Sequence, residues 1–261
     1  MTVNDLIARF GEQHVAAFFL VLARLGPLFV LAPLFSSKLV PARVRGIVAV
    51  GLAIGIAPVV SKGATLPLGA YDLTWLVLKE MLVGAGFAFA IGALFAALSA
   101  AGTLLDTSIG FSYGSLVDPI TGNQSTVLAQ LYSLVGTMVF IVIGGDGWVV
   151  RGIAKTYDLV GLDQAPDLGR LVSAMDATFG AIMVSALEVA GPVMLALILT
   201  DAAFGVVSRV VPQLNVFAVG FPAKVVVGLL LVGATLPFVA GWISGELQQD
   251  VGSALNAIRV G

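Results

Sequence analysis

Cysteine and charged residues are scarce in this chain, and each shortage excludes a class of protein. The 261 residues include no cysteine, which excludes a disulfide framework and a thiolate site. The single histidine, His14, leaves no plausible zinc cluster. Only 11% of the residues are charged, whereas a soluble globular chain carries roughly 25%. Because so few polar residues cannot cover a soluble domain of this size, lipid or a large apolar partner must cover much of the surface.

A basic cluster of the kind that binds nucleic acid is also missing. The net charge is −2 and the isoelectric point is near 5.3, with no clustered basic face. The first residues, Met1–Gly11, contain Asp5 and Arg9 and lack the basic start of a cleavable signal peptide. We therefore expect no nucleic-acid partner, and we expect the first apolar stretch to remain in the mature protein.

Apolar residues are abundant, at 59% of the chain with a mean hydropathy of +1.05. Three stretches, 81–105, 119–145 and 225–245, contain no charged residue, and each exceeds the ~20 residues that a helix needs to cross a bilayer. In lipid a helix satisfies its own backbone hydrogen bonds. The sequence therefore predicts an all-α integral membrane protein. About six apolar helical segments are expected, at Val15–Phe35, Val44–Val60, Leu73–Ala101, Thr126–Ile143, Phe179–Leu199 and Val216–Ile243.

Three of these segments are less regular than the others. Val15–Phe35 contains Pro27 and Pro33, Phe179–Leu199 contains Pro192, and Val44–Val60 is near the lower length limit. Proline removes a backbone hydrogen bond and tends to kink a helix. We therefore expect several kinked or broken helices that face protein instead of lipid. The sequence contains no repeat or linker, which predicts a single domain over residues 1–261, and its evenly divided Lys and Arg residues indicate no membrane orientation.

Glycine is the other abundant residue, with 31 in the chain. Gly51 and Gly55, like Gly241 and Gly245, have the GxxxG spacing that lets helix backbones approach closely. Any one pair can reflect only the general glycine richness of membrane helices, but together the pairs favour tight helix packing, either inside the chain or against partners.

Ionisable residues inside apolar segments are candidates for function. Arg24, Glu188 and the adjacent Lys79 and Glu80 qualify, either as functional groups or as ion pairs and interfacial residues. A proton relay needs several acids along one path, and Glu188 is nearly alone in its segment. The sequence has no GxSxG, HExxH or phosphate-binding motif. We therefore expect no enzymatic activity, no cofactor and no metal.

The segment 102–125 mixes glycine and hydroxyl residues with apolar side chains. Asp118-Pro119, followed after Ile120 by Thr-Gly-Asn, is a pattern typical of a turn. A solvated loop does not need so many apolar residues, so the composition suits a buried position. An ordinary re-entrant or interfacial loop is the alternative.

Several motifs together resemble a known family. They are Pro33, the run Val40-Pro41-Ala-Arg43-Val-Arg45, the stretch Asp106-Thr-Ser-Ile-Gly110-Phe-Ser, the block Asp118-Pro119-Ile-Thr-Gly-Asn-Gln-Ser125, and above all Val211-Pro-Gln-Leu-Asn-Val-Phe-Ala-Val-Gly-Phe-Pro-Ala-Lys224. With them the chain resembles the FliR family, which includes the equivalent injectisome (SctT) export proteins, over essentially its whole length. The sequences of the last two blocks favour the flagellar branch of the family over the injectisome branch.

The resemblance implies a structural and gating role in the flagellar type III protein export gate. FliR-family proteins assemble with FliP and FliQ into a helical ring on which FlhB and FlhA dock. Unfolded flagellar proteins enter this channel to cross the bacterial inner membrane at the flagellar basal body. The resemblance also implies kinked helical hairpins, much of them raised out of the membrane plane.

The resemblance further implies that the loop after the third apolar segment plugs the closed pore. The matching stretch here is Gly110–Gln124, with Phe111 as the obstructing side chain. Bulky apolar groups exclude water from a constriction, and glycine allows the backbone to withdraw. The predicted plug residues are Ile109, Gly110, Phe111, Tyr113, Gly114, Leu116, Asp118, Pro119 and Gly122.

A second set of residues is predicted to be structural or to face partners. Its members are Pro33, Pro41, Arg43, Glu188, Pro212, Asn215, Phe217, Pro222 and Lys224. Lys224 is expected to reach an acidic group or the membrane interface. Glu188 is expected to be paired, neutral or exposed to a water-filled crevice, because an isolated carboxylate in hydrocarbon is costly.

Three other functions remain as alternatives to a flagellar export subunit. An injectisome subunit would have the same architecture. A secondary transporter would require an inverted repeat with broken helices in matching halves, and the prolines at 27, 33 and 192 do not pair in that way. An intramembrane enzyme would require a nucleophile or a metal set.

Overall fold

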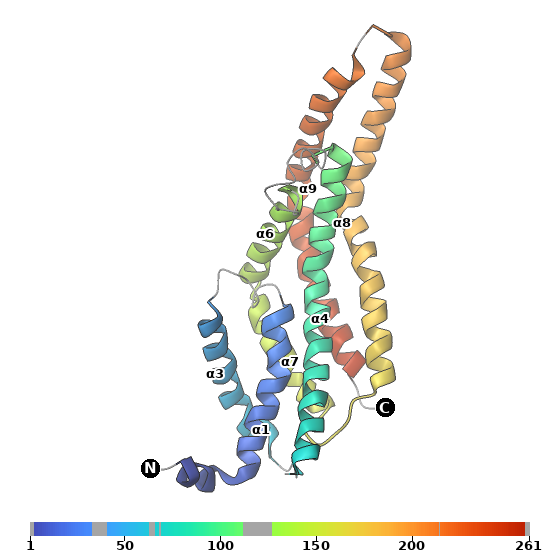
Figure 1. The fold of residues 1–261 in the computed structure, drawn as a ribbon. Coiled ribbons are helices and arrows are strands. Elements are labelled where there is room, and N and C mark those ends of the chain that lie inside the picture. Colours follow the sequence, from blue (N-terminus) through green and yellow to red (C-terminus); the bar gives the residue numbers. More distant parts are fainter. Residues whose placement is uncertain are drawn as a thin grey trace. The chain divides into compact units, whose positions relative to one another are not determined.

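The computed structural model describes residues 3–32, 41–62, 66–67, 69–111, 127–213 and 215–258, with the backbone alone at 3–10 and 216–217. All regular structure in these ranges is α-helical, which confirms the predicted all-α class (Figure 1). The described residues form the helices α1 (Val3–Leu31), α3 (Ala42–Val60), α4 (Ala70–Ile109), α6 (Val127–Val142), α7 (Gly145–Leu159), α8 (Leu168–Val210) and α9 (Val216–Ile258).

The three longest helices extend well past their apolar segments. α4 has 40 residues, and α8 and α9 have 43 each. At 1.5 Å per residue they are about 60–65 Å long, roughly twice the ~30 Å hydrocarbon thickness of a bilayer. Judged by length and composition, five helices could cross a membrane, or six if the bent pair α6 and α7 is one span. The segment count is therefore confirmed, but parts of the long helices must extend beyond the hydrocarbon.

The breaks in the helices lie at glycines. Gly11 has φ 70° and ψ 142° inside α1, and Gly144 has φ 70° between α6 and α7, which meet at a bend of 73°. Glycine adopts such positive φ values without steric cost. Pro27 and Pro192, where the sequence predicted kinks or breaks, lie inside α1 and α8, and Pro27 lies beyond the break at Gly11.

The chain divides into two compact units. Unit 1 comprises Met1–Ala93, Gly144–Thr178 and Leu247–Gly261, and unit 2 comprises Leu94–Ile143 and Phe179–Glu246. In unit 1, α1 and α3 pack side by side (Figure 1). α3 buries one stripe of alanines spaced four residues apart, Ala49, Ala53 and Ala57.

Close backbone approach occurs at glycines outside the GxxxG pairs. In unit 1, a β-carbon on Gly84 would overlap the backbone carbonyl oxygen of Arg24. In unit 2, a β-carbon on Gly102 would overlap the backbone of Leu128 and Ala129. By contrast, no described atom lies within 4 Å of a β-carbon built on any of the four GxxxG glycines, 51, 55, 241 and 245. Those pairs therefore make no close helix contact among the described residues.

α7 was not predicted from the sequence. It buries Val149, Gly152, Ile153, Thr156 and Tyr157, which recur every three or four residues as the apolar face of a helix does. Charged residues on its other face hid this pattern, because the 144–163 region contains four of them within thirteen positions, Asp146, Arg151, Lys155 and Asp158. The helical periodicity of the buried residues is the signal that would have identified it.

Candidate functional site

A fully buried ion pair lies in unit 1 between α1 and α4. The Arg24 guanidinium donates from Nη2 to Glu80 Oε1 at 2.9 Å and from Nε to Oε2, so the contact is bidentate. Lys79 Nζ lies 3.0 Å from the same Oε1. The side chains of Arg24 and Glu80 are 0% exposed, and that of Lys79 is 3% exposed. Two cations thus share one carboxylate inside the helix packing.

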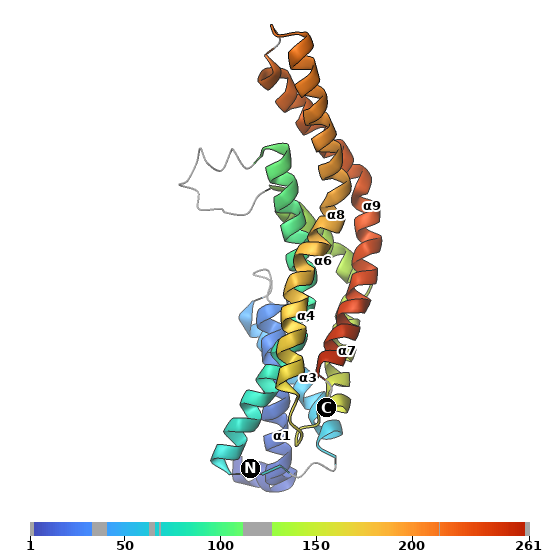
Figure 2. The same cartoon turned by 90° about the vertical axis from the view of Figure 1, so that its right-hand side faces the viewer.

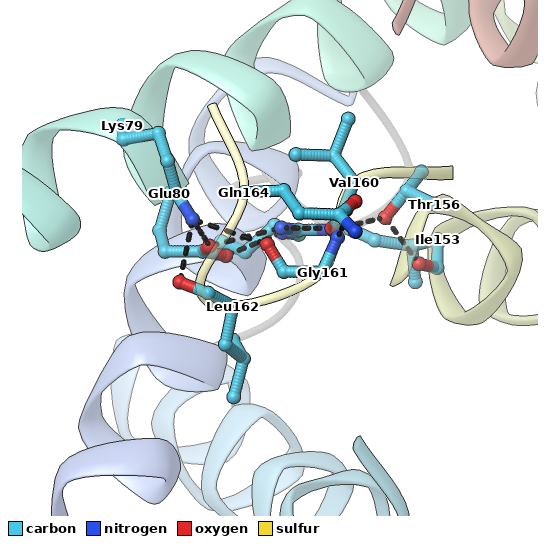
Figure 3. A network of polar contacts seen from close by, with 9 residues as sticks. Lys79, Glu80, Ile153, Thr156, Val160, Gly161, Leu162 and Gln164 are labelled. Atoms are coloured by element: carbon cyan, nitrogen blue, oxygen red, sulfur yellow. Dashed lines mark hydrogen bonds and ion pairs between the residues drawn. The ribbon is translucent and has the colours of Figure 1, made fainter. Parts of the chain in front are cut away.

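The same cations hold the turn that follows α7, and Figure 3 shows Lys79 beside this turn. Arg24 Nη1 donates to Thr156 Oγ1 at 3.0 Å, and Nη2 donates to the carbonyl oxygen of Val160 at 2.9 Å. Lys79 Nζ donates to the carbonyl oxygen of Leu162 at 2.7 Å. These carbonyls lie at and just beyond the C-terminal end of α7, where cations interact favourably with the helix dipole.

We name Arg24, Lys79, Glu80, Thr156 and Val160 the charge cluster. The Tyr157 ring covers the Arg24 guanidinium, with 3.9 Å from Cζ to the ring centroid. The buried donors and acceptors of the cluster form hydrogen bonds and ion pairs with one another. The cluster therefore has a structural role, because it connects α1, α4 and the end of α7. The ion-pair interpretation of Arg24, Lys79 and Glu80 is therefore confirmed.

In unit 2, α4 ends at the first of the predicted plug residues. Ile109 is buried, and its Cδ1 lies 2.6 Å from where a β-carbon on Gly228 of α9 would stand. Gly110 has φ 105°, and Phe111 is half-buried. The other predicted plug residues lie outside the described residues: Tyr113, Gly114, Leu116, Asp118, Pro119 and Gly122.

Asp106 is a buried acid that the predicted site residues did not include. Its Oδ2 accepts hydrogen bonds from the backbone N–H groups of Leu128 at 2.9 Å and Ala129 at 3.3 Å. Asp106 is the first charged residue after the charge-free run of α4. An acid at the end of such a run is a signal for a specific partner, but its partners are 22 and 23 residues further along the chain.

Three polar pairs connect α8 and α9 within unit 2, where both views show the helices side by side (Figures 1 and 2). Ser185 Oγ donates to Glu246 Oε1 at 3.1 Å. Trp242 Nε1 donates to Glu188 Oε2 at 3.2 Å. A third pair, Lys224 Nζ with Asp201 Oδ2 at 2.7 Å, lies nearer the hairpin turn. Residue numbers rise along one helix as they fall along the other, so these pairs set the register of an antiparallel hairpin.

The predicted structural residues lie mostly at helix ends. Asn215 caps α9, because its Oδ1 accepts the N–H of Ala218 at 3.2 Å. Pro212 lies in the turn between α8 and α9, and Pro222 lies inside α9. In α3, Pro41 is the N-cap residue, and Arg43 lies exposed in the first turn. Pro33 and the side chain of Phe217 lie outside the described residues.

Lys224→Ala is expected to lower the yield of the assembled complex modestly. The lysine reaches an acidic group, as the sequence predicted. Its carboxylate partner is 57% exposed, so the pair contributes at most about 1 kcal/mol to stability. Complex yield and swimming motility check this result. Arg170→Ala, which removes an exposed cation from a 3.5 Å pair in unit 1, is the matched control. A Lys224 variant that assembles normally yet exports no substrate would indicate a direct role in transport.

Glu188→Gln is expected to assemble and to support export as the wild type does. Glutamine keeps the shape and retains an oxygen that accepts the Trp242 Nε1 hydrogen bond. Substrate secretion and recovery of the complex are the measurements. Complete loss of secretion by an intact complex would point instead to proton coupling through the carboxylate.

Comparison with known proteins identifies the family to which the chain is similar. The model of the family "Bacterial export proteins, family 1" matches residues 15–249. The chain is 32% identical to the flagellar biosynthetic protein FliR of Bacillus subtilis, over 83% of this chain and 84% of that protein. It is 27% identical to FliR of Escherichia coli, with 85% of each chain covered.

An injectisome relative also matches. The surface presentation of antigens protein SpaR of Shigella flexneri is 27% identical over 87% of this chain and 89% of its own. Both kinds of relative match more than four fifths of the chain, and the resemblance to the FliR family is confirmed. With a family model that begins in α1 and ends in α9, the chain belongs to the bacterial export proteins of family 1.

Proposed function

We propose that the chain is a structural and gating subunit of the flagellar type III protein export gate. The observation that carries the proposal is the family match over residues 15–249, together with the FliR relatives. The several apolar helices make the chain a multi-pass membrane protein. The proposed location is the bacterial inner membrane at the flagellar basal body, and the proposal assigns the chain no catalytic role.

Assembly with partners is supported by the exposed apolar surface of α8 and α9 in unit 2. Near the hairpin turn, large apolar side chains are exposed on both helices, among them Val206 at 63%, Val210 at 73% and Phe221 at 49%. Exposed apolar patches of this kind mark contacts with protein or membrane. Helices of about 65 Å exceed the hydrocarbon thickness of a bilayer, which supports cover by protein for part of this surface.

The proposed partners are FliP and FliQ homologues in a shared ring, with FlhB and FlhA docked on it. The proposed cargo is unfolded flagellar protein. Both units then work as one export-gate domain over residues 1–261, held internally by the charge cluster and by the polar pairs of the α8–α9 hairpin.

The proposed plug is Gly110–Gln124, with Phe111 as the obstructing side chain. Its described beginning supports the proposal, because Gly110 turns the chain out of α4 with φ 105° and Phe111 follows at once. Phe111 is large and apolar, as a water-excluding constriction requires.

Native mass spectrometry of the tagged chain, expressed with its neighbouring genes, tests the proposal. The expected result is one complex that contains FliP and FliQ homologues. A chain that purifies alone and moves a small solute in vesicles would contradict the proposal and favour a secondary transporter.

An injectisome export subunit is the second candidate, because SpaR relatives match over a similar length. Secretion separates the two candidates. Deleting the gene is expected to stop flagellar secretion and motility, whereas loss of host-directed secretion with normal motility would favour the injectisome.

A further inference from the structure

Asp106 bonds described residues on both sides of the segment 112–126, which are 110–111 before it and 128–129 after it. On one side, the N–H groups of Gly110 and Phe111 donate to the backbone carbonyl oxygen of Asp106, at 3.0 and 2.9 Å. On the other side, the Asp106 carboxylate accepts the N–H groups of Leu128 and Ala129, the second and third residues of α6. One residue therefore holds the end of α4 through its main chain and the start of α6 through its side chain.

The first of these contacts ends α4 in a defined direction. The N–H of Phe111 bonds to a carbonyl five residues earlier, with the positive-φ Gly110 between them. This is the six-to-one hydrogen bond of a Schellman-type helix end. A side chain other than glycine at this φ would strain the turn.

The second contact caps the start of α6 with a side chain from another helix. The first N–H groups of any helix lack partners within the helix, and the residue just before it usually satisfies those of its second and third residues. In α6 an acid from another helix bonds the same two groups. Leu128 and Ala129 are buried, at 1% and 3% exposed, so water cannot replace the carboxylate, and the N-terminal end of the helix favours its negative charge.

Gly102 allows the two helices to come this close. It lies one turn before Asp106 on the same face of α4, and its missing side chain leaves room for the backbone of Leu128 and Ala129. Asp106 itself is 0% exposed, which is costly for a carboxylate unless it is hydrogen-bonded. The two N–H groups supply these bonds to Oδ2, whereas Oδ1 has no hydrogen-bond partner among the described residues.

We infer that Asp106 is a positioning residue that fixes the end of α4 and the start of α6, the described residues on either side of the 112–126 segment, against each other. The inference deepens the proposed function, on which it rests where it treats that segment as the plug. Because the anchor is made of described contacts within unit 2, it can be tested separately from the plug.

Hydrogen exchange of the assembled complex, followed by mass spectrometry, tests the anchor. In Asp106→Ala, amides at 128–129 are expected to exchange about tenfold faster, as loss of a helix cap implies. The remainder of α6, 132–142, should keep its protection. Asp106→Asn retains an acceptor oxygen and is expected to restore most of the protection. Asp201→Ala, which removes an exposed acid from unit 2, should leave the 128–129 amides unchanged.

Two outcomes would overturn the inference. One is unchanged exchange at 128–129 in Asp106→Ala. The other is loss of protection throughout unit 2 in both the Ala and the Asn variants, since Asp106 would then support the whole fold instead of the two ends.

Ion leak through the same preparations, measured in reconstituted vesicles, separates the anchor from the plug. Faster exchange without added leak supports the anchor and shows that closure of the pore does not depend on it. Added leak with unchanged exchange supports the plug and contradicts the anchor.

Discussion

Glu80→Ala is expected to reduce the folded chain in the membrane to a small fraction of the wild-type level, and export with it. The substitution leaves Arg24 and Lys79 buried without their shared carboxylate. Removing one partner of a buried ion pair costs about 3–5 kcal/mol, a large part of the 5–15 kcal/mol that stabilises an ordinary domain. Immunoblotting of membranes and thermal unfolding of the purified complex measure the effect.

Two other variants calibrate this prediction. Glu80→Gln keeps the shape and some hydrogen bonds but leaves both cations uncompensated, so it should lie between the wild type and the alanine variant. Asp201→Ala removes an acid from a pair whose carboxylate is 57% exposed, and it should cost no more than about 1 kcal/mol. Equal membrane levels for Glu80→Ala and Asp201→Ala would show that the charge cluster does not hold unit 1 together.

Gly84→Val is expected to prevent the native packing of α1 on α4. The added β-carbon would overlap the carbonyl oxygen of Arg24, and a backbone atom cannot move aside as the end of a side chain can. Overpacking in a core typically costs about 1–3 kcal/mol. We expect at least this much here, because a shift of α1 would also displace the Arg24 guanidinium from Glu80. Membrane level and unfolding temperature again report the result.

Gly51→Val is the matched control for Gly84→Val. It makes the same change in an apolar helix, at a glycine with no described atom within 4 Å of a built β-carbon. The stability of the isolated chain should not change. Reduced recovery of partners with this variant would indicate that the GxxxG face of α3 packs against another subunit. Equal stability of the two variants would contradict the described contact between α1 and α4.

The apolar runs were sufficient to predict an all-α membrane protein, but they did not predict where its helices end. α8 continues past its apolar segment through Asp201, and α9 continues past its own through Glu246, because a helix satisfies its own backbone hydrogen bonds whether its side chains are apolar or charged. α7 was missed for a related reason, since the charges on its exposed face masked the helical spacing of its buried residues.

The site was predicted in part. Arg24 and Glu80 each stood out as charges in apolar segments, but they are 56 residues apart, and no local pattern pairs them. The anchoring role of Asp106 was missed because its partners are backbone N–H groups, which every residue except proline possesses. Lys224 was expected to find an acid, yet which acid depends on the register of the α8–α9 hairpin.

Resting ion leak through the assembled complex tests the proposed gating role most directly. Vesicles containing the wild-type complex are expected to hold an ion gradient, because a pore wide enough for an unfolded chain must stay closed at rest. Phe111→Ala, or deletion of half of Gly110–Gln124, should leave the partner complex intact and raise the leak severalfold, since a dewetted constriction needs bulky apolar side chains. A loop-deleted complex that assembles and remains as tight as the wild type would contradict the gating role, and closure would then belong to the partner subunits.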